Sequence, residues 1–284
     1  MTTDAPHRHE LARHLRTVRI EAGHSGASLA RELGWTQPRV SRLETGSQLP
    51  TEDDLSAWIT HTGVEDDRAE QLRRMLALAE SEYASWKVEY STRGAAGVQR
   101  SIGGRETETT HTRQLAIGVL PGLVQTPAFA RAVVSIQHGP RAWGADDAAL
   151  DEMVAARMQR QHVLYEPDRT FTFVIPESTL RTRFSSDVDV QIGQLDRLAT
   201  VAGLATVNLY VMPDDRPWPV FPLASFVVHD HDRAVLEEQC GEHIVTSPDA
   251  VKAYAAMVDT CAEHAVGGDE AVEIIRRVAS ELRV

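Results

Sequence analysis

One short run of side chains in the sequence is of the kind that binds metal ions. The sequence His-Asp-His-Asp at 229–232 offers metal-ligand types, and Glu242 and His243 follow nearby. Alternation along a strand would send His229 and His231 to one face, where no further ligand completes the set. A solvated turn is therefore the favoured interpretation of this run.

The sequence lacks the common signatures of catalysis. It contains no nucleophile elbow, phosphate-binding loop, dinucleotide fingerprint or HExxH motif. Its two cysteines, Cys240 and Cys261, are too few for a disulfide framework and lack CxxC spacing, so we expect buried thiols. We therefore expect a chain that is not an enzyme, with no catalytic residue, no cofactor and no metal.

The arginines near the N-terminus form a second group with chemical potential. The whole chain has 29 basic and 41 acidic side chains and a net charge of −12. Residues 1–63 nevertheless hold 7 arginines against 8 acidic residues, so residues 64–284 carry most of the negative charge. Between Leu11 and Leu43, six arginines face only two glutamates, which makes this stretch locally basic.

Apolar spacing predicts four short helices around these arginines. They cover roughly 10–22, 26–33, 37–44 and 51–62. Ser25 and Thr36 are suitable N-caps for the second and third helices, and Thr51 with Asp54 has the spacing of a capping box. Gly34 suits the turn between the second and third helices because glycine adopts left-handed backbone angles readily.

The second and third helices have the architecture of a helix-turn-helix. Ala30 is small where the helices cross, Gly34 makes the turn, and Val40 places the third helix in the core. The segment resembles the repressor-type helix-turn-helix of the XRE family, with the pattern LA-x-x-x-G-x-(S/T)-Q-x-x-(I/V)-S-x-x-E-x-G and a final proline, here Pro50. Every fixed position of that pattern is met over residues 29–46.

The resemblance implies that the third helix enters the major groove of DNA. The residues it carries over to DNA contact are Ser25, Thr36, Gln37, Arg39, Ser41 and Arg42. Gln can pair with adenine and Arg with guanine, each for about 1–3 kcal/mol of discrimination, and Thr36 suits a phosphate. The family often has Gln where this chain has Gly26, so Ser25 and backbone N–H groups must hold that phosphate.

Other charged residues of this part have less specific interpretations. Arg13, Arg16 and Arg19 are candidates for contacts with the DNA backbone, with a solvated helix face as the alternative. We expect Glu44 to be structural, bonding or capping near the turn that follows it. A scaffold of four helices that binds no DNA is the alternative for the whole motif.

The remaining chain combines helices and strands. Residues 66–86 predict an amphipathic helix that connects the domains or pairs with its copy in a dimer, and residues 91–104 predict a loop or mobile linker. Strands are expected at 171–175, 206–211, 225–228 and 234–237, and helices at 147–165, 188–202, 248–266 and 269–282. Late strands without helices between them favour an antiparallel or mixed sheet.

A second local signature lies at 118–132, with the sequence GVLPGLVQTPAFARA. It resembles the vPGLLQT-x-x-YARA segment of an uncharacterised C-terminal domain in actinobacterial regulators. The resemblance implies a sensing, partner-binding or oligomerising role, with a small companion protein as the expected partner and a small-molecule effector as the rival. The residues to watch are Gln125, Arg131, Glu177 and Arg181, with structural hydrogen bonding as the alternative for each.

Together these features predict an α+β protein with an all-α helix-turn-helix domain at 1–63, a connector and linker at 64–113, and a mixed α/β domain at 114–284. No apolar run could span a membrane and Met1 to Glu10 does not resemble a secretory signal, so we expect a cytoplasmic protein. The expected function is a homodimeric, sequence-specific transcriptional regulator that binds a double-stranded DNA operator. The alternative is an antitoxin-like interaction module for which DNA contact is secondary.

Overall fold

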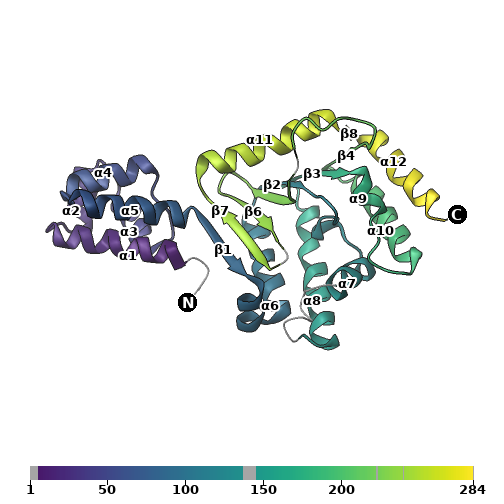
Figure 1. The fold of residues 1–284 in the computed structure, drawn as a ribbon, viewed down its shortest axis with the longest axis horizontal. Helices are drawn as coiled ribbons and strands as arrows, with labels where there is room; N and C mark the ends of the chain where they lie inside the picture. The colour runs from purple at the N-terminus through teal and green to yellow at the C-terminus, as the bar shows by residue number, and fades with distance from the viewer. Residues whose placement is uncertain (1–5, 137–144, 222, 239, 284) are drawn as a thin grey trace. The chain divides into compact units, whose positions relative to one another are not determined.

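The computed structural model describes residues 6–136, 145–221, 223–238 and 240–283, and for 6 and 81–83 the backbone alone. The chain divides into two units, one formed by Met1–Tyr83 with Ile244–Ser247 and the other by Ala84–His243 with Pro248–Val284. The first unit is mainly helical and the second combines helices with strands, so the α+β fold class is confirmed (Figure 1).

The first unit contains the expected helix-turn-helix elements. Its described helices are α1 (Pro6–Glu21), α2 (Gly26–Glu32), α3 (Gln37–Thr45), α4 (Glu52–Thr62) and α5 (Asp66–Ala79). Thr51 caps α4 as predicted: its side chain accepts from the Asp54 N–H at 3.1 Å, and the Asp54 carboxylate accepts from the Thr51 N–H at 3.2 Å. This reciprocal pair satisfies two N–H groups that the helix start would otherwise leave free.

Helix α5 belongs to the same core as the four helices before it. Leu72, Leu76 and Ala79 are buried with Trp58 of α4 and Leu15 of α1. The helical unit therefore extends beyond residue 63, where the sequence suggested a domain end. The apolar face of α5, considered above for a connector or a dimer seam, is used inside this unit.

The chain leaves the helical state earlier than its periodicity suggested. Helix α5 ends at Ala79 and strand β1 (Ser81–Ser85) follows, whereas the sequence predicted one helix over 66–86. The N–H of Thr246, next to β7 (Gly241–Val245), donates to the Glu80 carbonyl at 2.8 Å. Pairing of β1 with β7 in the sheet overrides the local helical pattern.

The second unit is built around a mixed sheet. The other described strands are β2 (His111–Leu115), β3 (Thr170–Pro176), β4 (Val207–Met212), β5 (Phe226–His229), β6 (Arg233–Glu237) and β8 (Val266–Gly267). The sheet order is β1-β7-β6-β5-β2-β3-β4-β8, with β2, β3 and β4 parallel and with β5 antiparallel to both β2 and β6. The predicted mixed sheet is confirmed, but β1, β2, β7 and β8 were not predicted.

Helices cover both faces of this sheet. The described helices of this unit are α6 (Trp86–Glu108), α7 (Pro127–Ser135), α8 (Asp147–Arg160), α9 (Glu177–Arg181), α10 (Val188–Val201), α11 (Pro248–His264) and α12 (Gly268–Glu281), with short 3₁₀ turns η1 (Gly122–Val124) and η3 (Gln161–Tyr165). Phe171 and Phe173 of β3 share the main core with α10 and α12. On the opposite face, Phe226 of β5 contacts Tyr254 of α11, with ring centroids 4.8 Å apart.

The segment expected to be a loop at 91–104 is part of α6, which bends at Gly94, where φ is +68°. Its glycines suggested flexibility, but one of them, Gly103, allows close packing between helices. A Cβ on Gly103 would lie 2.9 Å from Cγ of Arg160 on α8, so only glycine allows this approach. Buried Ala95 and Val98 add apolar contact that offsets the low helix propensity of glycine.

Candidate nucleic-acid interface

Helices α2 and α3 are joined by a tight turn with defined hydrogen bonds. Gly34 adopts φ +68° with open space where a Cβ would lie, so its backbone angle is what requires glycine. The Trp35 N–H donates to the Ala30 carbonyl at 2.7 Å across this turn. Val40 and Leu43 are each 1% exposed, which fixes one face of α3 in the core.

The opposite face of α3 presents polar side chains. Gln37, Ser41 and Arg42 are exposed, and helical spacing places Gln37 and Ser41 on adjacent turns of one face. Arg42 donates through Nε to Gln48 Oε1 at 3.2 Å, a contact between two surface side chains. These three predicted residues are therefore available to a partner in the way that base contacts require.

The two predicted phosphate contacts differ in their local bonds. Thr36 is the N-cap residue of α3 with an extended backbone, but its exposed side chain makes no capping hydrogen bond. Ser25 caps α2, and its Oγ accepts from the Ser28 N–H at 3.0 Å. Thr36 keeps its hydroxyl for an outside acceptor, whereas Ser25 already satisfies a helix N–H.

Arg39 is held by other residues of the unit. Its Nη2 donates to both carboxylate oxygens of Asp54, at 2.8 and 3.0 Å, and its guanidinium lies 4.6 Å from the Trp35 ring centroid. Asp54 is also the residue that completes the α4 capping box. Arg39 therefore links the start of α4 to α3, a structural role that the sequence interpretation did not include.

Arg19, a candidate backbone contact, is buried instead. Its Nε and Nη2 donate to the two Glu44 oxygens at 2.5 and 2.8 Å, and Nη1 donates to the His24 carbonyl at 2.6 Å. The Glu44 hydrogen bond, only partly opposed by burial, raises the pKa of Arg19. Glu44 is thus structural, as expected, while Arg13 and Arg16 are exposed on α1.

Two of the four residues singled out in the second unit have structural surroundings. Gln125 is 2% exposed, and its side chain donates to the Leu120 carbonyl at 2.8 Å and accepts from Arg157 at 2.9 Å. Arg131 forms surface ion pairs with Asp147 and Asp151. Neither residue lines the pocket described below.

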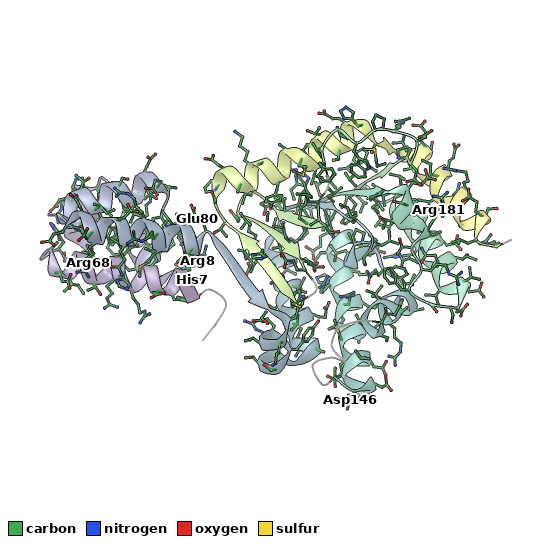
Figure 2. The ribbon with its side chains drawn as sticks, in the orientation of Figure 1. His7, Arg8, Arg68, Glu80, Asp146 and Arg181 are labelled. Carbon is green, nitrogen blue, oxygen red and sulfur yellow. The ribbon has the colours of Figure 1, made fainter. Side chains whose placement is uncertain are left out.

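The other two residues, Glu177 and Arg181, form one ion-pair cluster with α12. Glu177 is 5% exposed and accepts from Arg181 at 2.8 Å and from Arg277 at 2.9 Å. Arg181 also donates to Glu281 at 2.9 Å, which ties α9 to α12 at the side of the unit labelled Arg181 in Figure 2. Burial by itself raises the pKa of Glu177, but the hydrogen bonds from Arg181 and the Asp214 N–H and the Arg277 charge outweigh it and lower that pKa.

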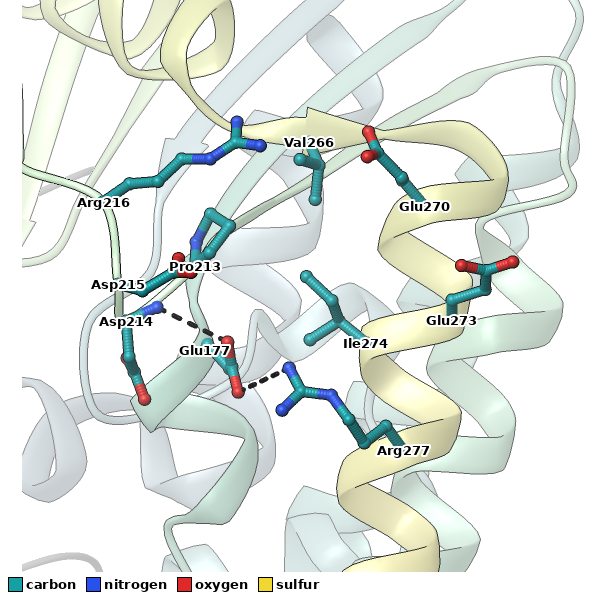
Figure 3. A pocket seen from close by; sticks show the side chains of 10 residues that line it. All are labelled: Glu177, Pro213, Asp214, Asp215, Arg216, Val266, Glu270, Glu273, Ile274 and Arg277. Carbon is teal, nitrogen blue, oxygen red and sulfur yellow. Dashed lines mark hydrogen bonds and ion pairs between the residues drawn. The ribbon is translucent and has the colours of Figure 1, made fainter.

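A pocket of about 640 Å³ opens beside this cluster (Figure 3). Its walls are the segment that follows β4, residues 213–216, and one side of α12. Glu177 lines it from α9 and Val266 from β8. The structure thus places Glu177, but not its partner Arg181, in the lining of a cavity that can hold a small ligand.

Both units match known domain families. Residues 10–72 match a helix-turn-helix domain, which agrees with the placement of α1 to α5 in one unit. Residues 99–277, more than half of the 284-residue chain, match the domain of unknown function DUF5753. The chain belongs to the DUF5753 family.

The chain was also compared with solved structures and with curated proteins. The chain is similar to the structure of TrmBL2, an archaeal chromatin protein that shows a novel mode of DNA binding, with 10% identity, 86% of this chain and 88% of that chain covered, and a TM-score of 0.33. A likeness at this score supports no conclusion about fold or function. No curated protein matches the chain. Among the described helices, none combines the length and apolarity needed to cross a membrane.

The candidate metal run lies in the DUF5753 domain as a tight turn between β5 and β6. His229 is 5% exposed and bonds Thr109 Oγ1 at 3.1 Å, and the Asp230 carboxylate accepts from the His111 N–H at 2.6 Å. The prediction of a solvated turn was therefore wrong for His229, which is buried as the last residue of strand β5. No group of three metal-ligating side chains occurs among the described residues.

Sequence reasoning missed the partners that define these sites. Asp54 and Trp35 bind Arg39, and Arg277 binds Glu177, across separations that no local pattern reveals. The capping box did mark Asp54 as a fixed carboxylate, and that signal could have suggested a cationic partner. Arg277 carried no such signal, because a lone arginine on an exposed helix face is usually solvated.

Proposed function

We propose that the chain is a sequence-specific DNA-binding transcriptional regulator of the XRE family and of actinobacterial type. The observation that supports this most is α3, which buries Val40 and Leu43 while Gln37, Ser41 and Arg42 stay exposed. A recognition helix needs this combination, since its core face fixes its position and its outer face must meet base edges.

In this proposal α3 lies in the major groove. Gln37 and Arg42 have the donors and acceptors to read adenine and guanine, for about 1–3 kcal/mol per bidentate pair. The free hydroxyl of Thr36 and the N-terminal N–H groups of α2 behind Ser25 suit phosphates. In this proposal Arg39 contacts no base, because its guanidinium is already bound to Asp54 and Trp35. It acts by holding α3 in position.

A homodimer follows from the weak charge of the helix-turn-helix. With 7 arginines and 8 acidic residues in residues 1–63, one copy gains little non-specific attraction to DNA. Two copies on a pseudo-palindromic operator, with half-sites about one helical turn apart, double the specific contacts. We place this regulator in the cytoplasm, where it meets its operator, and assign it no catalytic step.

The proposed role of the DUF5753 domain is to bind a partner protein or a small effector. The pocket beside Glu177 supports the effector, because its size lies in the range of small-molecule sites. Gln125 and Arg131 are better explained by structural bonds than by a ligand.

The test is fluorescence-anisotropy binding of the purified full chain to DNA from upstream of its own gene, with a scrambled duplex as the control. We expect tight, sequence-selective binding that weakens as salt rises, because phosphate contacts release counterions. Equal binding to the two duplexes, or binding to neither, would contradict sequence-specific regulation.

A further inference from the structure

The pocket beside Glu177 has an excess of negative charge. Five carboxylates line it against the guanidinium groups of Arg216 and Arg277. Both arginines are engaged, since Arg277 pairs with Glu177 and Glu281, and Arg216 donates to the His264 carbonyl at 3.4 Å. The five carboxylates nevertheless outnumber the two guanidinium groups, so a positively charged group entering the pocket would meet a net negative charge.

Three of these carboxylates have no partner in the described part of the chain. They are Asp215 on the segment after β4 and Glu270 and Glu273 on α12, and all three are exposed (Figure 3). Like charges gathered on facing walls repel one another and raise the local potential for a cation. A structural role would instead pair them, as it pairs Glu177.

Glu177 adds a buried acceptor at the same place. One of its oxygens, Oε1, accepts from both Arg181 and Arg277, at 2.8 and 2.9 Å. From the described residues the other oxygen, Oε2, receives only the Asp214 N–H, at 3.4 Å, so it retains capacity for a further donor. Figure 3 shows this carboxylate between Asp214 and Arg277 at the pocket wall.

Part of the lining is apolar. Pro213 and Val266 are buried, and Ile274 is half-buried where α12 faces the pocket. Apolar carbon beside fixed carboxylates fits a ligand with a short alkyl chain and a cationic end. A free phosphate or carboxylate ligand is disfavoured, because the unpaired carboxylates would repel it.

We propose that this pocket binds a small organic cation, an alkylamine or alkylguanidine. The cationic group lies among Asp215, Glu270 and Glu273 and donates to Glu177 Oε2, and the alkyl chain packs on Val266 and Ile274. That this ligand is the effector of a regulator rests on the proposed function. Binding of the ligand to the pocket does not depend on DNA. The same chemistry can come from a free molecule or from an arginine side chain of a partner.

The test uses isothermal titration calorimetry on the full chain with two cationic probes. Agmatine represents the free ligand, and a capped glycine pentapeptide with a central arginine represents a protein side chain. Glutarate serves as the anionic control. The variant Glu270→Gln with Glu273→Gln removes two unpaired charges with little change of shape, and Glu108→Gln with Glu152→Gln is its matched control on exposed carboxylates of α6 and α8.

We expect saturable binding of agmatine, no binding of glutarate, and a loss of about fivefold in affinity in the pocket variant but not in the control variant. Binding of the peptide without agmatine would support the pocket and identify a polypeptide as the source of the cation. No saturable binding of either probe, or equal loss in both variants, would overturn the inference. DNA binding measured on the same samples separates this failure from failure of the proposed regulator.

Discussion

The outer face of α3 and the interior of the DUF5753 domain differ in whether their polar side chains are bound by the protein itself. On α3, Gln37, Ser41 and Arg42 are exposed. In the DUF5753 domain, Gln125 and Glu177 are buried and fully engaged in hydrogen bonds or ion pairs with the protein itself, apart from one oxygen of Glu177. A polar side chain serves an outside partner only where the fold leaves its donors and acceptors free.

This contrast predicts two kinds of mutational effect. Removal of an enclosed polar group should cost stability, because its partner is left buried without compensation. Removal of an exposed group should cost binding and leave stability unchanged. Each of the four predictions below could break this distinction.

The largest effect is expected at His229 as the pH falls. Burial, reinforced by the Arg105 charge, lowers the pKa of His229 to about 3. Below the ordinary pKa of 6.5 the unfolded chain binds a proton that the folded chain excludes, so stability falls by on the order of 1 kcal/mol per pH unit as the pH drops from 6.5 toward 3. Urea unfolding across this pH range should show a flatter profile for His229→Gln than for the parent.

The matched control is His231→Gln, because His231 lies in the same turn but is exposed. Its unfolding profile should follow that of the parent. Parallel profiles for the parent and His229→Gln would show that the enclosed histidine does not control acid stability.

The second effect, at Arg19, tests whether an enclosed residue of the helix-turn-helix unit behaves like those of the DUF5753 domain. Arg19→Ala leaves the largely enclosed Glu44 carboxylate without its partner, and the loss of such a partner costs about 3 kcal/mol. The urea midpoint of the first unit should fall strongly, whereas Arg16→Ala, on the exposed face of the same helix, should leave it unchanged. If Arg19→Ala still bound DNA with the affinity of the parent under conditions that unfold this unit, the assignment of DNA binding to this unit would be wrong.

A feature could be predicted from the sequence where local contacts determine it, and could not where contacts between distant segments do. Helices α2 to α4 were predicted closely because caps, turn glycines and apolar spacing are local. Strand β2, with the sequence His-Thr-Arg-Gln-Leu, lacked apolar alternation and forms because β3 and β5 pair with it on either side. The helix at 86–108 was not predicted, because its glycines suggested a loop. Gly103 is needed there for close contact with Arg160, a residue far away in sequence.

The candidate site follows the same rule. The exposed face of α3 was predictable, since it depends on one helix and its buried residues. The enclosure of Arg19 by Glu44 depends on a partner 25 residues away, and that of Glu177 by Arg277 on one 100 residues away. Pairings of this kind are set by the tertiary fold, which local spacing does not encode.

The third effect concerns Arg42 and should appear in DNA binding alone. Arg42→Ala removes an exposed guanidinium and should weaken operator binding by about 1–3 kcal/mol while reducing discrimination at one base pair. Anisotropy titrations with operator and scrambled duplexes measure both quantities. Arg74→Ala, an exposed change on α5, is the control, and an equal loss in the two variants would remove Arg42 from the interface.

The smallest effect is expected at Arg39, which lies between the two classes because it is on α3 yet bound to Asp54 and Trp35. Arg39→Ala should lower the free energy of unfolding by about 1 kcal/mol, since the pair is partly exposed. It should weaken operator and scrambled DNA alike, because it loosens the support of α3 and removes no base contact. A double-mutant cycle with Asp54→Asn tests this: coupling in stability places Arg39 with the enclosed residues, whereas loss of discrimination at one base pair without coupling would make it a reader of sequence.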